Sequence, residues 1–98
     1  MERNEILENL LLRKTGRIIS GSSVWEEVEC AAEEAGEGCQ WITGQDDTLE
    51  KWSYYVEITR TFDSDLEQWE TCISLEEISI TDKKTGNTIY IQVKGAEI

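Results

Sequence analysis

The first third of the chain repeats its hydrophobic residues with the period of an α-helix. Residues 5–14 carry one apolar stripe, and Asn4 stands where an N-cap residue would begin that helix. A second stripe lies within residues 24–35, where Ser23 and Glu26 match the S-x-x-E pattern of a capping box. The patterns predict two amphipathic helices, each of which has one face to bury.

After Gly38 the hydrophobic positions change to a period of two, which is typical of β-strands with one buried face. The parity of the apolar positions switches near Glu76 and Glu77, so we expect a β-bulge or a break between two strands there. Gly86 and Asn87 are expected to supply positive φ angles in a tight hairpin turn. The expected strands are residues 39–43, 50–62, 66–81 and 88–93.

Alternation within these strands assigns each side chain to an apolar or a polar face. Phe62, Trp69 and Ile89 lie on the apolar faces, which the core should bury. Tyr55 and Tyr90 lie on the other face, which an antiparallel sheet can leave open to water. The pattern therefore predicts an α+β fold, with two N-terminal helices packed on one face of an antiparallel meander of about four strands.

The length and composition agree with one folded unit. Of the 98 residues 39% are hydrophobic, so residues 1–98 are expected to form a single acidic α+β domain. Charges interrupt the N-terminal apolar run, unlike in a secretory signal, and no stretch approaches the roughly 20 apolar residues of a membrane span. We expect a cytoplasmic protein without membrane contact, located in the host-cell cytoplasm if a phage encodes it.

The distribution of charge departs from that of an ordinary small domain. The formal net charge is −12, and residues 26–82 hold 17 acidic residues but only Lys51 and Arg60 as bases, a net of −15. Residues 1–25 and 83–98 have net charges of +1 and +2. The folded domain should therefore have a strongly negative side.

The residue types argue against catalysis and metal binding. Histidine is absent, which removes the usual general base, and Cys30, Cys39 and Cys72 lack the close spacing that zinc sites use. We expect three buried free thiols, no catalytic residue, no bound metal and no cofactor. Residues 63–70 superficially suggest a calcium-binding loop, but the Gly that such a loop needs at its sixth position and the Glu at its twelfth are missing. Direct nucleic-acid binding is disfavoured, because the domain would repel phosphate groups.

The acidic residues suggest a function in which negative charge makes the contact. Five glutamates between positions 26 and 34 would form a ridge about 12 Å long, and helix neighbours about 5–6 Å apart approach the spacing of phosphates along one strand. We expect a small inhibitor that docks on a basic nucleic-acid-binding surface as a DNA mimic would, with Tyr55, Tyr90 or one of the tryptophans as anchors. The predicted partner-binding residues are Glu26, Glu27, Glu29, Glu33, Glu34, Asp46, Asp47, Asp63, Asp65, Glu67, Glu70, Tyr55 and Tyr90.

In size and composition the whole chain resembles small acidic phage proteins of the anti-CRISPR and anti-restriction kind, a likeness that no shared motif accompanies. The resemblance implies a basic protein partner, such as a nuclease or a CRISPR or restriction complex. Two alternatives use the same composition: an immunity protein that neutralises a basic toxin or nuclease, and an acidic adaptor domain whose charge serves only solubility. These alternatives and the oligomeric state stay open at the level of the sequence.

Overall fold

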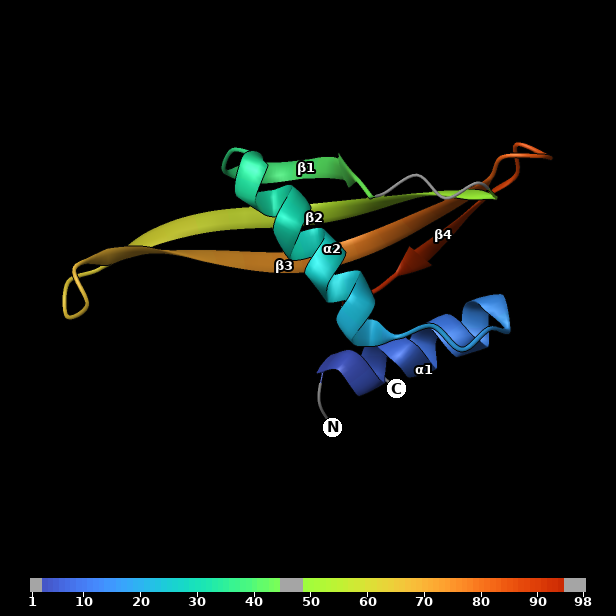
Figure 1. Ribbon diagram of the computed structural model, residues 1–98, viewed down its shortest axis with the longest axis horizontal. Helices are drawn as coiled ribbons and strands as arrows, with labels where there is room; N and C mark the ends of the chain where they lie inside the picture. The colour runs from blue at the N-terminus through green and yellow to red at the C-terminus, as the bar shows by residue number, and fades with distance from the viewer. Residues whose placement is uncertain (1–2, 45–48, 95–98) are drawn as a thin grey trace.

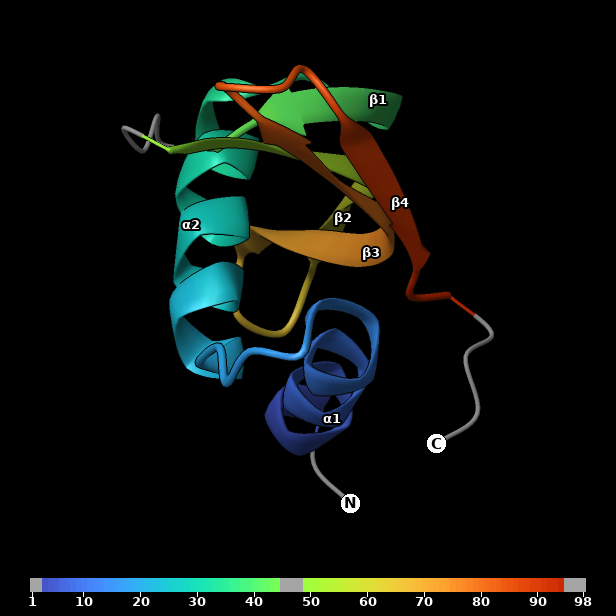
Figure 2. The ribbon, with the colours of Figure 1, turned by 90° about the vertical axis from the view of Figure 1, so that its right-hand side faces the viewer.

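The protein is described by a computed structural model that covers residues 3–44 and 49–94, and it consists of two helices packed on a twisted antiparallel sheet (Figure 1). The helices precede the strands along the chain, and the strands follow the order β1-β2-β3-β4 in the sheet. Both helices cover the same face of the sheet (Figure 2). The α+β meander expected from the sequence is confirmed. The elements are α1 (Arg3–Thr15), α2 (Gly21–Glu34), β1 (Gly38–Thr43), β2 (Glu50–Asp63), β3 (Gln68–Asp82) and β4 (Thr88–Gln92).

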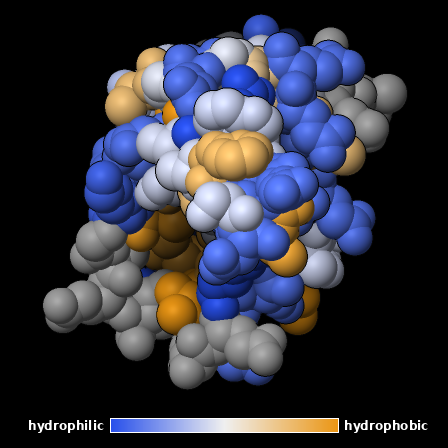
Figure 3. All heavy atoms as spheres, turned by 90° about the vertical axis from the view of Figure 1, so that its left-hand side faces the viewer, coloured by the Kyte–Doolittle hydropathy of each residue, from blue (hydrophilic) through white to orange (hydrophobic). Residues whose placement is uncertain are grey.

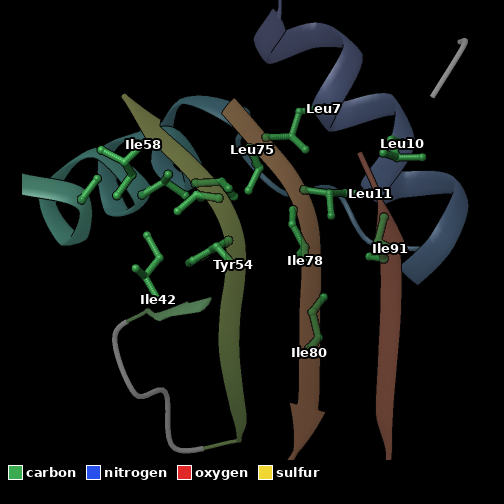
Figure 4. Close-up of a cluster of buried hydrophobic side chains, with 14 residues drawn as sticks. Leu7, Leu10, Leu11, Ile42, Tyr54, Ile58, Leu75, Ile78, Ile80 and Ile91 are labelled. Atoms are coloured by element: carbon green, nitrogen blue, oxygen red, sulfur yellow. The ribbon is translucent and has the colours of Figure 1, made fainter. Parts of the chain in front are cut away.

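The hydrophobic core lies between the two helices and one face of the sheet (Figure 4). β2 supplies its centre, where Tyr54, Val56 and Ile58 are at most 1% exposed. Full burial of one aliphatic side chain stabilises a fold by about 1.5–3 kcal/mol, so this layer is the main source of stability. The other buried hydrophobic residues are Leu7, Leu10, Leu11, Val24, Val28, Ala32, Ile42, Leu75, Ile78, Ile80 and Ile91.

A β-bulge in β3 keeps its apolar residues on the core side. Tyr55 pairs with Glu77, but the next residue, Val56, pairs with Leu75, so Glu76 is the extra residue on β3. The prediction of a bulge from the switch in parity is confirmed. Because one residue is inserted, apolar side chains before and after the bulge point to the same face.

The turn between β3 and β4 has one left-handed residue rather than the two expected. Gly86 has φ +77°, as predicted, whereas Asn87 does not have a positive φ, so that part of the prediction is wrong. One such residue is enough because the loop closes on Asp82. The Asp82 carbonyl accepts from the Gly86 N–H at 2.8 Å, and the Asp82 N–H donates to the Asn87 carbonyl at 2.9 Å.

The first turn of α1 is used for helix packing. Asn4 lies inside the helix, so its predicted role as the N-cap is wrong. Its backbone supports α2 closely, since a Cβ atom added to Gly21 would lie 2.5 Å from the Asn4 carbonyl oxygen. The contact between the helices therefore requires glycine at position 21. This packing contact, more than a capping hydrogen bond, determines where Asn4 lies in α1.

Capping of α2 is shifted by one turn relative to the sequence pattern. Ser20 is the N-cap residue, and its Oγ accepts a hydrogen bond from the Ser23 backbone N–H at 3.4 Å. The capping box predicted for Ser23 and Glu26 is therefore wrong, because both residues lie inside the helix. A serine one turn earlier offers the same acceptor, and this earlier start brings Gly21 against α1.

Strands β2 and β3 extend beyond the rest of the sheet (Figure 1). β1 pairs with β2 only as far as Ile58 and β4 does not reach this part of β3, so residues 59–72 form a two-stranded hairpin, here called the β2–β3 ribbon. Phe62 and Trp69 are exposed on this ribbon because neither helix covers it, and Ile89 is exposed on the edge strand β4. The expectation that these three side chains are buried is wrong.

Candidate protein-binding surface

Two groups of charged side chains, one basic and one acidic, lie near opposite ends of the longest axis of the molecule, which measures 49 Å. The C-terminal end of α1 and the loop after β3 lie near one end, where residues of both line the same hollow (Figure 1). The β2–β3 ribbon, with the acidic residues of positions 63–70, lies at the opposite end. Bases therefore gather at the end of the molecule opposite the ribbon, where the carboxylate of Glu50 pairs with Arg17 at 2.8 Å. Exposed bases at the first end are Arg13, Lys14, Arg17, Lys83 and Lys84.

The outer side of α2 carries fewer free carboxylates than the sequence pattern suggests. Glu26, Glu33 and Glu34 are exposed. Glu29 is exposed too, but its carboxylate pairs with the guanidinium of Arg3 at 3.1 Å. Such an exposed ion pair adds little stability, yet it places a cation directly on the acidic side of the helix. The predicted ridge is therefore neutralised at Glu29.

Glu27 faces the sheet instead of the solvent. The Tyr54 hydroxyl donates a hydrogen bond to its carboxylate. Burial raises the pKa of Tyr54, and the Glu27 carboxylate raises that pKa further, so the hydroxyl remains a protonated donor. Gly44 leaves room for the carboxylate, because a Cβ atom at that position would overlap with it. Glu27 thus joins α2 to the sheet and is a structural residue.

Acidic residues of the β2–β3 ribbon divide into one that builds the loop and others that are free to contact a partner. The Asp63 carboxylate accepts hydrogen bonds from the backbone N–H groups of Asp65, at 2.9 Å, and Leu66, at 3.3 Å. This is the turn that Asp side chains favour. Asp65, Glu67 and Glu70 have exposed side chains that extend from the same loop and strand. Glu67 has a left-handed backbone, with φ +51°.

Three large apolar side chains are exposed on the same ribbon. Phe62 and Trp69 are directly paired across the strands, with ring centroids 5.5 Å apart and planes tilted by 59°. They are 53% and 69% exposed, and Leu66 in the loop is 61% exposed. Figure 3 looks onto this end of the molecule, where hydrophilic residues in blue surround a small pale to orange area. The ribbon therefore combines apolar contacts with an acidic border.

Sequence reasoning did not select Phe62 or Leu66 as partner-binding residues. As a possible anchor, Trp69 was included only as one of the four tryptophans. Strand alternation placed both aromatic residues on a face that is buried elsewhere in the sheet. The useful signal was the difference in strand length, because β2 has 14 residues and β1 has only 6. A strand that is longer than the strands beside it ends in a hairpin that the rest of the sheet does not flank.

The open face of the sheet carries a second aromatic group. Trp41 on β1 packs against Tyr55 on β2, with ring centroids 5.2 Å apart, and Tyr90 on β4 is exposed. Both tyrosines lie on the face that the helices leave uncovered, as strand alternation predicts. This face is the reverse of the one on which α2 packs (Figure 2).

The three cysteines are exposed, so the expectation of buried thiols is wrong. Cys72 and Cys39 alternate with core-facing residues of β3 and β1, which turns them to the open face, while Cys30 lies outside the apolar stripe of α2. Partial desolvation and the neighbouring carboxylates of Glu57 and Glu76 raise the pKa of the Cys39 thiol. A thiol with a raised pKa holds little nucleophilic thiolate near neutral pH.

The predicted partner-binding residues fall into three regions of the fold. The helix glutamates occupy α2, the acidic residues of positions 63–70 occupy the ribbon, and Tyr55 and Tyr90 occupy the open face. One flat partner surface cannot contact the outer side of α2 and the open face together, because the sheet separates them (Figure 2). Asp46 and Asp47 lie outside the described residues.

Within residues 3–44 and 49–94, no group of three or more Cys, Asp or Glu side chains is arranged to hold a metal ion. Neither helix in this part of the chain is long and apolar enough to cross a membrane. Comparison with protein-family models, with curated proteins and with solved structures found no match for this chain.

Proposed function

We propose that this chain is an acidic inhibitor that docks on the basic, nucleic-acid-binding surface of another protein and competes there with DNA or RNA. The observation that carries the proposal is the set of exposed carboxylates on the β2–β3 ribbon and on α2. A phage inhibitor of a CRISPR or restriction complex is one setting for this activity. The residues proposed to make the acidic contact are Glu26, Glu33, Glu34, Asp65, Glu67 and Glu70.

Arg60, the base within the β2–β3 ribbon, is engaged within the fold. The Arg60 guanidinium donates a hydrogen bond to the Ala35 carbonyl at 2.7 Å, and the Arg60 backbone N–H donates to the Glu37 carboxylate at 2.8 Å. A cation is favourable at the C-terminal end of a helix, where it meets the negative end of the helix dipole. Arg60 therefore ties α2 to the root of the ribbon and does not neutralise the loop carboxylates beyond it.

The excess of like charge favours a basic partner. Carboxylates held near one another repel, and this repulsion opposes the compact state of the free protein. A groove that binds nucleic acid through Lys and Arg would relieve the repulsion, and it would lose its access to phosphates while occupied. Association driven in this way is fast and weakens as salt screens the charges.

A capture experiment at two salt concentrations tests the proposal. Tagged protein should recover a basic nucleic-acid-binding protein from host lysate at about 0.1 M salt and release it at about 1 M, where the Debye length falls to about 3 Å. Adding duplex DNA or RNA should displace the purified partner from the tagged protein. Recovery of no such partner, or binding that nucleic acid does not disturb, would refute the proposed function.

Two variants of equal net charge provide the control. Glu67→Gln with Glu70→Gln removes two charges from the ribbon, and Glu5→Gln with Glu8→Gln removes two from α1. We expect the ribbon pair to raise the Kd about tenfold and the α1 pair to change it by less than about threefold. Equal losses would mean that only the total charge attracts the partner.

A further inference from the structure

We propose that the β2–β3 ribbon is the element that enters the partner, with Phe62, Leu66 and Trp69 as its apolar anchors. The partner surface is a pocket or groove in a protein, apolar inside and bordered by Lys and Arg side chains. This inference rests on the proposed function, and it assigns to one hairpin the contacts that hold the complex together.

Clustering of the apolar side chains is the first reason for this assignment. Single exposed hydrophobic residues are normal on a soluble protein, but a group surrounded by polar residues marks a contact surface. Here the three side chains occur within residues 62–69 of one hairpin, and each is more than half exposed. Large aromatic residues are also the type that most often dominates binding energy.

Ribbon stability does not explain the whole group. A two-stranded hairpin without a third strand is marginal, and the packed rings of Phe62 and Trp69 help to hold its strands together. Leu66 is not part of that pair, because it lies in the loop between Asp65 and Glu67. An exposed leucine between two carboxylates adds little to the fold, but it would gain from burial in a partner.

The backbone of the loop is a second, independent observation. Glu67 has φ +51°, a conformation that a residue with a Cβ atom rarely adopts. The loop between β3 and β4 has Gly86 in the corresponding place, with φ +77°. A carboxylate retained where glycine would be free of strain is consistent with a contact made by that side chain.

The border of the anchors sets the charge of the partner. Asp65 and Glu67 flank Leu66 in the loop and would lie at the rim of the contact when the apolar side chains are buried. Glu70 follows Trp69 in β3 and therefore points to the other face of the ribbon. Leaving carboxylates unpaired beside a desolvated contact is costly, so the opposing rim must supply cations. Nucleic acid does not fit this description, because its phosphates would face the same carboxylates.

Binding of single variants to the protein recovered by the salt-dependent capture tests the inference. We expect Trp69→Thr to raise the Kd at least about thirtyfold and Leu66→Ser about tenfold, mainly through faster dissociation, since buried anchors act on the off-rate. Thr is chosen at position 69 because it keeps strand propensity. Amide hydrogen exchange of residues 59–72 measures how far the ribbon stays formed in each variant. Leu66→Ser leaves the Phe62–Trp69 pair intact, so it separates a lost contact from a loosened ribbon.

Two exposed residues elsewhere serve as matched controls. Tyr90→Thr removes an aromatic ring from the open face, and Ile18→Ser removes an aliphatic side chain that is 91% exposed. Each should change the Kd by less than about threefold if the ribbon is the anchor. If Tyr90→Thr causes the large loss, the partner docks on the open face and the inference is wrong.

The remaining outcomes separate this inference from the proposed function. If both Trp69→Thr and Leu66→Ser bind like the wild type while the ribbon is formed, the inference is wrong. The proposed function would still stand if Glu67→Gln with Glu70→Gln weakened binding. If Glu67→Gln with Glu70→Gln also left binding unchanged, both the inference and the proposed function would be refuted. Sedimentation analysis tests for self-association. If the wild-type protein forms dimers and Leu66→Ser dissociates them, the ribbon binds a second copy of this chain instead.

Discussion

Two hairpin loops of the described residues, 64–67 and 83–87, lie at opposite ends of the molecule and have two backbone features in common (Figure 1). Each follows an aspartate whose carboxylate accepts hydrogen bonds from the backbone N–H groups two and three positions later. In each, the fourth loop residue is left-handed, which is Glu67 in the first loop and Gly86 in the second. The two turns therefore share an aspartate cap and a left-handed fourth residue.

The side chains of these loops are opposite in character. One loop presents Asp65, Leu66 and Glu67, and the other presents Lys83, Lys84 and a glycine. Because the same turn forms with either set, turn geometry does not demand the acidic and apolar residues of the first loop. These residues are therefore better explained by what they contact outside the loop.

Replacing Gly86 with glutamate should produce the largest change in stability. A left-handed backbone costs a residue with a Cβ atom about 1–2 kcal/mol, so Gly86→Glu should lower the free energy of unfolding by about that amount. Urea denaturation measures the change. An unaltered midpoint would show that glycine has no advantage at this position. The left-handed conformation of Glu67 would then not indicate strain.

Removing the aromatic pair should have an intermediate effect that is confined to the ribbon. Aromatic pairs contribute about 0.5–1.5 kcal/mol beyond area burial, so Phe62→Thr should speed amide exchange in residues 59–72 and leave the core amides of β2 nearly unchanged. Exchange that quickens equally across the molecule would contradict the view that the ribbon is a separate, weakly supported region.

Replacing Glu67 with glycine should have the smallest effect, and a stabilising one. Relief of the left-handed strain is partly offset by the greater freedom of glycine in the unfolded chain, which leaves a gain of about 0.5–1 kcal/mol. Thermal unfolding of Glu67→Gly beside wild type measures it. Under the proposal made above, the same variant binds its partner more weakly, so stability and affinity should move in opposite directions.

Particular residues show how far the sequence predicts this fold. The switch in apolar parity predicted a bulge or a break near Glu76 and Glu77, because the period of a strand is a local property, and the strand register places the bulge at Glu76. Helix starts were displaced, since Ser20 and Ser23 offer the same chemistry and the close contact of Gly21 with α1 decided between them. Phe62 and Trp69 could not be assigned correctly by alternation, which does not reveal where the covering helices end.

The order of residues is sufficient to predict the class of fold, the order of its elements and the region in which negative charge accumulates. These follow from periodicity and composition, which are properties of neighbouring residues. Which carboxylates are free depends on contacts in the folded molecule: Glu27 is turned to Tyr54 and Glu29 is paired with Arg3, whereas Asp65 and Glu67 flank the exposed Leu66. The reason is that pairing and burial depend on segments far apart in the chain, whose lengths leave the end of the β2–β3 ribbon uncovered.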